Sequence, residues 1–401
     1  MDTKFWSAFL AFLFVLGIIL VKPWLITFSI LVTILLSASY LYSKRSLKNI
    51  FYKRKWHYRR GFPGESTPFQ IEIENRKFLP LSWIKTIDLW PEDIPFKNEE
   101  VLRPSFLPRM GYLINYFSLA AREKIKRTYT VQFKNRGEYP IGPLEMVSGD
   151  IFGIHQEREK APVMDQLIVF PEILSLESLN LATENPFGEI KSNKRLFEDQ
   201  SRPMGVRAYH PEDDFRRIHW PATARSGEMQ VKVFEPITEQ VMIICLNVQT
   251  ASQPWLGFQN HLFEHLVKIS ATLSYQNVKN GYSIGLISNG SLKHSDQPFK
   301  VNPSKSPQQL SILLTSLAKI TPYIRAPFEK YLTSALPKLP FGASLTLVTA
   351  LVSEELCETL LRFKRYRSNT TLISLDQASP PSIPGINTIH LPYQEIQKNV
   401  V

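Results

Sequence analysis

The sequence predicts three structural parts in order: a two-helix transmembrane hairpin, an antiparallel β-sandwich and a doubly wound α/β domain. Three observations lead to this prediction. The first 43 residues carry two long uncharged runs, the middle of the chain alternates apolar and polar residues, and the last part carries nearly continuous apolar runs between helical patterns. With 401 residues, 44% of them hydrophobic, the chain is long enough for two or three domains.

Residues 1–43 have the pattern of a membrane hairpin. The runs 5–21 and 23–42 contain no charged residue, and Lys22 separates them. As helices they would be about 26 and 30 Å long, close to the hydrocarbon thickness of a bilayer. A signal peptide and a buried core hairpin are the alternatives, but no A-x-A-like cleavage site follows the first run. We therefore expect the lipid bilayer to be a partner of this protein.

The following segment, residues 44–60, reads KRSLKNIFYKRKWHYRR and contains no Asp or Glu. Positive residues beside a span stay in the cytoplasm, which predicts a two-helix protein of the cytoplasmic membrane with its soluble domains in the cytosol. The segment supplies much of the formal net charge of +11, so that charge does not by itself indicate nucleic acid. Its interleaved aromatic residues suit either a polynucleotide or anionic lipid, and the position beside the hairpin favours lipid.

Residues 61–176 have the pattern of the β-sandwich. In FQIEIEN, residues 69–75, and in YTVQF, residues 129–133, apolar side chains alternate with polar ones. The turn signals FPGE, NRGEY and IGP separate such stretches at short intervals. No cluster of His, Cys or acidic residues indicates chemistry here, so the expected role is spacing or protein contact. Residues 177–238 are expected to be a linker.

Residues 239–401 have the pattern of the α/β domain. The runs QVMIICLNV, YSIGLIS, SLTLVTALV and TTLISL are typical of parallel strands buried on both faces. Leucines at helical spacing predict helices around residues 262–273, 310–317 and 356–363. Ser353 is the expected N-cap of the last of these helices, with Glu354 and Glu355 in its first turn.

A ligand site in such a sheet lies at the carboxyl end of the first strand. The domain resembles the von Willebrand factor type A fold, whose metal-binding members carry D-x-S-x-S there and a further Asp after a later strand. The corresponding residues here are Asn247, Gln249, Ala251 and Ala350. Because magnesium needs hard, mostly charged oxygen ligands, we expect no metal and no cofactor. Cys245 and Cys357 lie far apart, which excludes a disulfide scaffold or zinc finger and indicates a reducing compartment.

Just before the first strand of this domain stands YHPEDDFRRIHWPATAR, residues 209–225. The longer segment 206–236 resembles the signature of a bacterial family known as domain of unknown function 58. R-G-x-Y at residues 136–139 and D-x-F-G at residues 150–153 agree with that family, whereas Glu212 stands where many relatives carry Gly. The signature residues, which are the candidate interaction site, are Arg207, Tyr209, Asp213, Asp214, Arg216, Arg217, Ile218, His219, Trp220, Ala224 and Arg225.

Members of this family are often found beside MoxR-type AAA+ ATPases and transglutaminase-like membrane proteins. The resemblance therefore implies a role in the assembly or remodelling of protein complexes, with such an ATPase and other membrane proteins as partners. It implies no known reaction.

The residues of the signature themselves leave several roles open. A hydrolase-type site would use His210 or His219 as the base, oriented by Asp213 or Asp214, but no nucleophile is obvious. For a metal site, the neighbouring arginines would compete for the carboxylates. A charge-paired clasp would bond guanidinium groups to carboxylates and insert Trp220 into the core beside Ile218.

The signature is also rich in Trp, Tyr and Arg, the residue types that dominate protein docking surfaces. We therefore expect a membrane-anchored, cytosol-facing, non-catalytic scaffold or adaptor. An enzyme centred on the His–Asp cluster is the main alternative, and a nucleic-acid binder using the basic segment is the weaker one.

Overall fold

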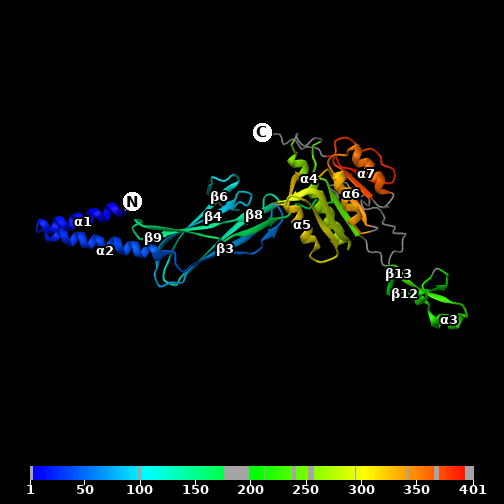
Figure 1. Ribbon diagram of the computed structural model, residues 1–401, viewed down its shortest axis with the longest axis horizontal. Coiled ribbons are helices and arrows are strands. Elements are labelled where there is room, and N and C mark those ends of the chain that lie inside the picture. Colours follow the sequence, from blue (N-terminus) through cyan, green and yellow to red (C-terminus); the bar gives the residue numbers. More distant parts are fainter. Residues whose placement is uncertain are drawn as a thin grey trace. The chain divides into compact units, whose positions relative to one another are not determined.

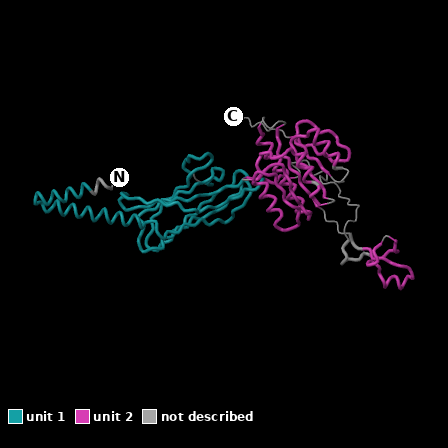
Figure 2. Tube along the Cα trace, viewed as in Figure 1, with its two compact units in different colours: residues 1–171 teal, residues 172–401 magenta. Residues whose placement is uncertain are grey.

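The computed structural model describes residues 3–97, 101–175, 198–211, 213–236, 241–251, 257–293, 295–340, 343–364 and 370–392. The chain divides into two compact units, residues 1–171 and 172–401 (Figure 2). Most of the first half of the expected linker lies outside the described residues.

The first unit begins with an antiparallel pair of helices, α1 (Thr3–Ile19) and α2 (Pro23–Ser46) (Figure 1). The buried hydroxyl of Ser29 donates a hydrogen bond of 2.8 Å to the carbonyl of Leu10, across the pair. Gly17 allows close approach, because a Cβ there would lie 3.0 Å from atoms of Ile26. The expected helix pair is confirmed. Among the described residues, α2 alone is long and apolar enough to cross a membrane, and the apolar part of α1 is shorter.

Residues 44–60 do not form a separate juxtamembrane segment, which corrects the sequence prediction. Ser46 ends α2, and Ile50–Trp56 forms strand β1, which pairs antiparallel with β3 (Ser66–Asn75). Along β1 the odd residues are exposed while Tyr52, Arg54 and Trp56 point inward, so the basic composition conceals a period of two. The Trp56 ring stacks on the ring of Phe69 at 4.5 Å.

The described strands of the first unit, β1 and β3 included, form three sheets, in which all pairs but one are antiparallel. The expected antiparallel β-region is thereby confirmed. The first sheet has the order β1, β3, β7 (Lys124–Gln132). The second has the order β10 (Gln156–Ala161), β9 (Leu144–Gly149), β4 (Leu81–Pro91), β6 (Met110–Leu119), β5 (Leu102–Pro104). The third has the order β2 (Arg60–Gly61), β11 (Asp165–Val169), β8 (Gly137–Ile141), with β2 parallel to β11.

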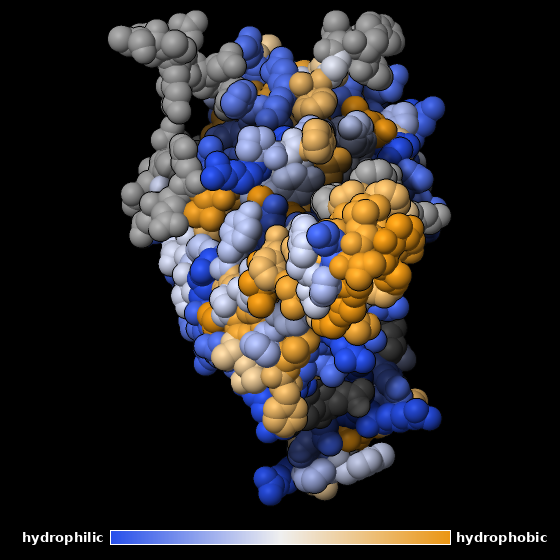
Figure 3. Space-filling view, turned by 90° about the vertical axis from the view of Figure 1, so that its left-hand side faces the viewer, coloured by the Kyte–Doolittle hydropathy of each residue, from blue (hydrophilic) through white to orange (hydrophobic). Residues whose placement is uncertain are grey.

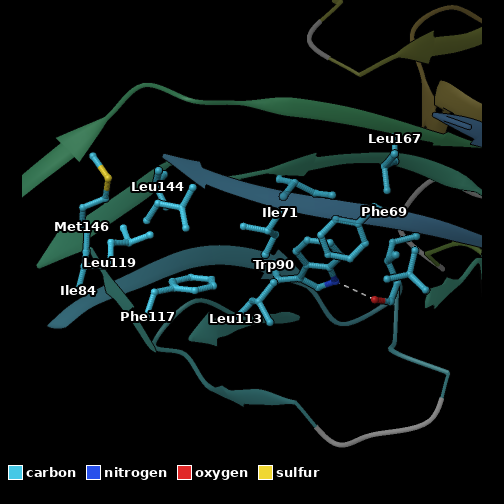
Figure 4. Packing of buried hydrophobic residues seen from close by; sticks show 14 of the residues in the cluster. Phe69, Ile71, Ile84, Trp90, Leu113, Phe117, Leu119, Leu144, Met146 and Leu167 are labelled. Carbon is cyan, nitrogen blue, oxygen red and sulfur yellow. Dashed lines mark hydrogen bonds between the residues drawn. The ribbon is translucent and has the colours of Figure 1, made fainter. Parts of the chain in front are cut away.

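A single apolar core joins these sheets (Figure 4). Phe69 and Ile71 of β3 face Trp90 of β4 and Leu113 of β6, and all four side chains are buried. The indole nitrogen of Trp90 donates a 2.8 Å hydrogen bond to the carbonyl of Ile94, so burial leaves this polar atom satisfied.

The same unit contains a buried ionic cluster that the sequence analysis missed. Arg54 is fully buried, with its guanidinium 3.7 Å from the carboxylate of Asp88 and 3.4 Å from that of Asp165. It also donates hydrogen bonds to the carbonyls of Ile141 and Val163. Burial is the largest influence on Asp88 and raises the pKa of its carboxyl. The cluster links β1, β4 and β11 through their side chains. Removing one member would be destabilising, because it would leave a buried charge without its partner.

The second unit contains a mixed, mostly parallel sheet, as expected. Its order is β16 (Pro298–Ser304), β15 (Ser283–Leu292), β14 (Val241–Leu246), β18 (Ser344–Thr349), β19 (Thr370–Ser374), β20 (Asn387–His390). The strands from β15 to β20 in this order run parallel, whereas β16 and the short β17 (Ile320–Ile324) pair antiparallel with β15.

Helices cover both faces of this sheet (Figure 1). α6 (Phe328–Ala335), followed by a short 3-10 turn at Leu336–Lys338, and α7 (Glu354–Lys364) share a core with Ile243 and Cys245 of β14. α4 (Asn260–Lys279) and α5 (Gln309–Lys319) contact each other and β15, on the opposite side, to which the alternate strand residues point. The hydroxyl of Ser353 accepts a 3.1 Å hydrogen bond from the amide of Leu356, as expected of an N-cap.

Candidate functional site

The signature segment folds as a small element of its own, which we call the signature hairpin and define as residues 205–236 (Figure 1). Strand β12 (Glu198–Ala208) pairs antiparallel with β13 (Gln230–Pro236), placing Arg207 opposite Val231. Between the strands lie a 3-10 turn, η1 (Phe215–Arg217), and a short helix, α3 (Trp220–Ser226). The second half of the expected linker is therefore regular structure.

Arg207 and Asp213 close the first turn of the hairpin. The guanidinium of Arg207 donates two hydrogen bonds, of 2.6 and 2.5 Å, one to each carboxylate oxygen of Asp213. The amide of His210 donates a third, of 2.8 Å, to the same carboxylate. Arg207 first, and the His210 amide second, hold the pKa of Asp213 at about 2. This pair is a bidentate guanidinium–carboxylate contact, the kind of contact that the clasp alternative of the sequence analysis would use.

Asp214 has a separate structural role. Its carboxylate accepts a 3.0 Å hydrogen bond from the amide of Arg216 and so caps η1. The ring of Phe215, the first residue of η1, lies 5.5 Å from the ring of Tyr209.

Ile218, and not Trp220, is the core residue of the hairpin. Ile218 forms an isolated β-bridge with Val231, and both side chains are buried. Trp220 is 66% exposed, which corrects the prediction that it inserts into a core. The prediction assumed an extended segment through both residues, but the chain enters α3 at Trp220, so the two side chains no longer share a side.

The capping residues at the two ends of α3 explain why the chain becomes helical at Trp220. The Nδ1 atom of His219 accepts a 3.0 Å hydrogen bond from the amide of Ala222, so His219 is the N-cap. Pro221 stands in the first turn, and Gly227 ends the helix in the left-handed conformation with φ of 72°. Proline just inside and glycine just after a helix are sequence signals that would have revealed α3.

The hydrogen bonds described above engage Asp213, Asp214 and His219, which are groups that a hydrolytic site would need. Among the described residues, neither histidine ring is hydrogen-bonded to Asp213 or Asp214, and no group of three His, Cys, Asp or Glu side chains is arranged for a metal ion. Since His219 accepts through Nδ1, the proton of its neutral ring lies on Nε2.

The outer surface of the hairpin is both apolar and cationic. Phe215, Trp220 and Met229 are large exposed apolar side chains. Arg216, Ala224 and Arg225 are also exposed, and within the described part of the chain neither arginine forms an ion pair. Arg217 is half-buried. The sequence analysis overlooked Phe215 and Met229, although large apolar residues in so charged a segment signal either a core or a contact surface.

The second candidate position is the carboxyl edge of the α/β sheet. Asn247 is buried and donates a 3.0 Å hydrogen bond to the hydroxyl of Thr349, while its carbonyl accepts from Asn289 at 2.9 Å and from the amide of Gln249 at 3.1 Å. The carbonyl of Asn289 in turn accepts from the amide of Val248 at 3.0 Å. Ala251 and Ala350 lie beside this amide network and offer no side-chain oxygen. The sequence analysis had not identified Asn289, although an Asn at the end of an apolar strand is the signal for it.

Residues 205–400 match the family model described as "Protein of unknown function DUF58". This match, which covers just under half of the chain, begins at the signature hairpin and continues through the α/β sheet.

One curated relative is the uncharacterized protein YeaD of Bacillus subtilis, 23% identical over 222 residues. The match covers 52% of this chain and 53% of YeaD, so the chain spans about half the length of that relative. Solved structures with some likeness include the CARDB domain of a Pyrococcus furiosus protein and a cohesin module of a Clostridium perfringens glycoside hydrolase. They cover 30% of this chain, with 89% and 95% of the respective structures, at TM-scores of 0.20 and 0.22 and 10% identity.

Proposed function

We propose that the protein is a membrane-anchored, cytosol-facing scaffold whose signature hairpin docks a partner protein. The observation that carries this proposal is the hairpin itself. The carboxylates of Asp213 and Asp214 and the ring of His219 are engaged in internal hydrogen bonds, while large apolar and arginine side chains remain exposed on so small an element. Exposed aromatic and arginine residues of this kind dominate the binding energy of protein interfaces.

The membrane anchor in this proposal is the pair α1 and α2. Trp24 and Tyr40 are exposed near the two ends of α2, about 24 Å apart at the helical rise, as expected of residues at the two bilayer surfaces. Lys44 and Arg45 follow in the last turn, which supports a cytosolic position for the domains after α2. α1 would cross beside α2, since Gly17 permits the close packing that membrane helix pairs use.

The favoured partner is an AAA+ ATPase of the MoxR type. The support is the resemblance of the signature to the DUF58 family, together with the match of residues 205–400 to that family. In this proposal the α/β domain is type A-like, with its metal position occupied by the amide network of Asn247 and Asn289. It acts without a metal, and the process served is the assembly or remodelling of complexes.

The proposal is tested by measuring the affinity between the full chain, reconstituted in lipid nanodiscs, and a purified MoxR-type ATPase. Trp220→Ala should weaken binding by roughly 2 kcal/mol, about thirtyfold, as for a docking hot spot. Tyr323→Ala is the matched control, because Tyr323 is 63% exposed on β17, and it should leave the affinity unchanged. Equal affinities for the two variants and the wild type would refute docking through the hairpin.

A further inference from the structure

The carboxyl end of α2 is fastened to the β-region by two side chains, Tyr42 and Lys77, which fixes this helix relative to the strands of its unit. The hydroxyl of Tyr42 donates a 2.6 Å hydrogen bond to the carbonyl of Pro80. The ammonium group of Lys77 donates to the carbonyls of Arg45, Ser46 and Lys48, and so caps the end of the helix.

The turn between β9 and β10, residues 150–155, lies against the same helix; we call it the contact loop. The Ser39 hydroxyl and the Nδ1 atom of His155 are 3.4 Å apart, and the ring of Tyr40 meets the His155 ring edge-on at 5.6 Å. The contact loop therefore lies at the level of Tyr40 along the axis of α2.

Hydrogen bonds to Asp150 hold the contact loop in its conformation. The carboxylate of Asp150 accepts hydrogen bonds from the amides of Phe152, at 3.1 Å, and His155, at 2.7 Å. The indole of Trp83 donates a 3.0 Å hydrogen bond to the carbonyl of Asp150. This arrangement displays Ile151 and Phe152 at the tip, where they are 71% and 65% exposed.

We propose that Ile151 and Phe152 insert into the interface of the lipid bilayer beside α2. The inference rests on the proposed membrane anchor, because Tyr40 is the residue that would lie at the headgroup level of a spanning α2. A rigid loop held at that level, with two large apolar side chains at its tip, enters the headgroup–acyl boundary by about 5–10 Å.

Cationic side chains around the end of α2 indicate that the lipid surface is anionic. The ammonium of Lys44 lies 5.9 Å above the Tyr40 ring. Arg122 covers the exposed ring of Phe78 at 4.0 Å, and Arg76 covers that of Phe51 at 3.8 Å while pairing with the carboxylate of Glu74 at 2.8 Å. The loops that carry these arginines lie beside the helix end, since the Arg76 amide donates to the carbonyl of Asn49. Cations and aromatic rings together favour the interface of an anionic bilayer.

The cavity between the helices and the contact loop is lined mostly by apolar side chains, as expected of a space that holds a lipid. It has a volume of about 910 Å³ and is lined by apolar residues of α1 and α2, with Tyr40 and His155 at one end. Figure 3 looks at the helix pair from its turn and shows hydrophobic residues gathered there. An acyl chain along the helices, with its headgroup near His155, would fill such a space.

The test places an environment-sensitive fluorophore on single cysteines of the full chain, in vesicles of phosphatidylethanolamine and phosphatidylglycerol. Cys357→Ser removes the half-buried thiol, and Cys245 is buried and inaccessible to the label. The labelled variants are Phe152→Cys in the contact loop, Leu31→Cys in α2, and Phe106→Cys. Phe106 is the control, because it is 99% exposed in the β5–β6 loop, at the opposite end of the second sheet.

Lipids carrying a nitroxide near the headgroup should quench the Phe152→Cys label, and lipids carrying it deep in the acyl region should quench the Leu31→Cys label. The Phe106→Cys label should be quenched by neither. If the Phe152→Cys label behaves like the Phe106→Cys label while the Leu31→Cys label is quenched, the loop inference is wrong and the anchor stands. If the Leu31→Cys label is not quenched either, the anchor itself is wrong and the loop inference fails with it.

Discussion

At the residue scale, the signature hairpin separates side chains that stabilise from side chains that are displayed. Ile218 and Val231 form its small core, Arg207 and Asp213 close its turn, and Trp220 lies outside both. This division decides which substitutions change stability and which change binding, and it differs from what residue type alone suggests.

Ile218→Ala should destabilise the hairpin, because it removes most of a buried side chain from a core of two residues. We expect a loss of about 2 kcal/mol or more in the free energy of opening the hairpin. Hydrogen exchange at the amide of His219, which donates to the carbonyl of Gln230 at 2.7 Å, reports that opening. Trp220→Ala should change it by no more than about 0.5 kcal/mol. Faster exchange in the Trp220→Ala variant than in Ile218→Ala would show that Trp220 is the anchor after all.

The clasp should respond to pH in a defined window. The pKa of Asp213 is about 2, below the value of about 3.9 that an unfolded aspartate has, so the folded state favours the carboxylate. The stabilisation is fully present above about pH 4 and is lost as the pH falls towards 2.

Arg207→Gln should raise the pKa of Asp213 towards that of a free aspartate and shift this loss to higher pH. A carboxyl NMR titration measures both variants, with the exposed Arg216→Gln as a control that leaves Asp213 unchanged. An Asp213 carboxyl that titrates alike in wild type and Arg207→Gln would argue against the clasp.

At the scale of elements, a polar network of Asn247, Asn289 and Thr349 lies at the edge of the α/β sheet where the sequence analysis looked for a metal site. We expect magnesium titrated into the protein to give no saturable binding at about millimolar concentration or tighter, because only neutral oxygens are present and they are already hydrogen-bonded.

Asn289→Ala should lower stability by about 1–3 kcal/mol, since it leaves the buried amide of Val248 without its acceptor. Calorimetric titration and thermal unfolding check the two statements, with Asn302→Ala, an exposed position on β16, as the control. One-to-one magnesium binding that Asn247→Ala abolishes would overturn the first.

The same elements show why some features could be predicted and others not. The strands of the α/β sheet are long apolar runs, and such runs identify buried parallel strands without tertiary information. β1 was assigned to a basic juxtamembrane segment because Lys53 and Lys55 dominate its composition, while the alternation that points Tyr52 and Trp56 inward spans only a few residues. The partners of Arg54 are distant in sequence, so no local pattern could reveal that cluster.

The sequence predicted which residues belong to the candidate site, but not how their side chains are arranged. The Arg207–Asp213 pair follows from charge complementarity over a short separation. The exposure of Trp220 depends on where α3 begins, which the His219 cap marks in the structure and which Pro221 and Gly227 signal in the sequence. The exposure of Phe215 depends on the same local turns.

At the scale of the whole molecule, the proposed anchor predicts a topology. Because Lys44 and Arg45 follow α2, the chain from Lys44 onward should lie in the cytosol. Protease added to intact spheroplasts should leave this part whole and should digest it only after lysis. Digestion in intact spheroplasts would place the domains on the outer side and would contradict the orientation.

The most direct test of the central claim is site-specific photocrosslinking in living cells, with a photoreactive amino acid at position 220 or at the equally exposed position 323. The claim that the signature hairpin docks an AAA+ ATPase at the membrane predicts a crosslink to that ATPase from position 220, in the membrane fraction, and none from position 323. No crosslink to the ATPase from position 220 in the folded, membrane-bound protein, or equal crosslinks from both positions, would contradict it.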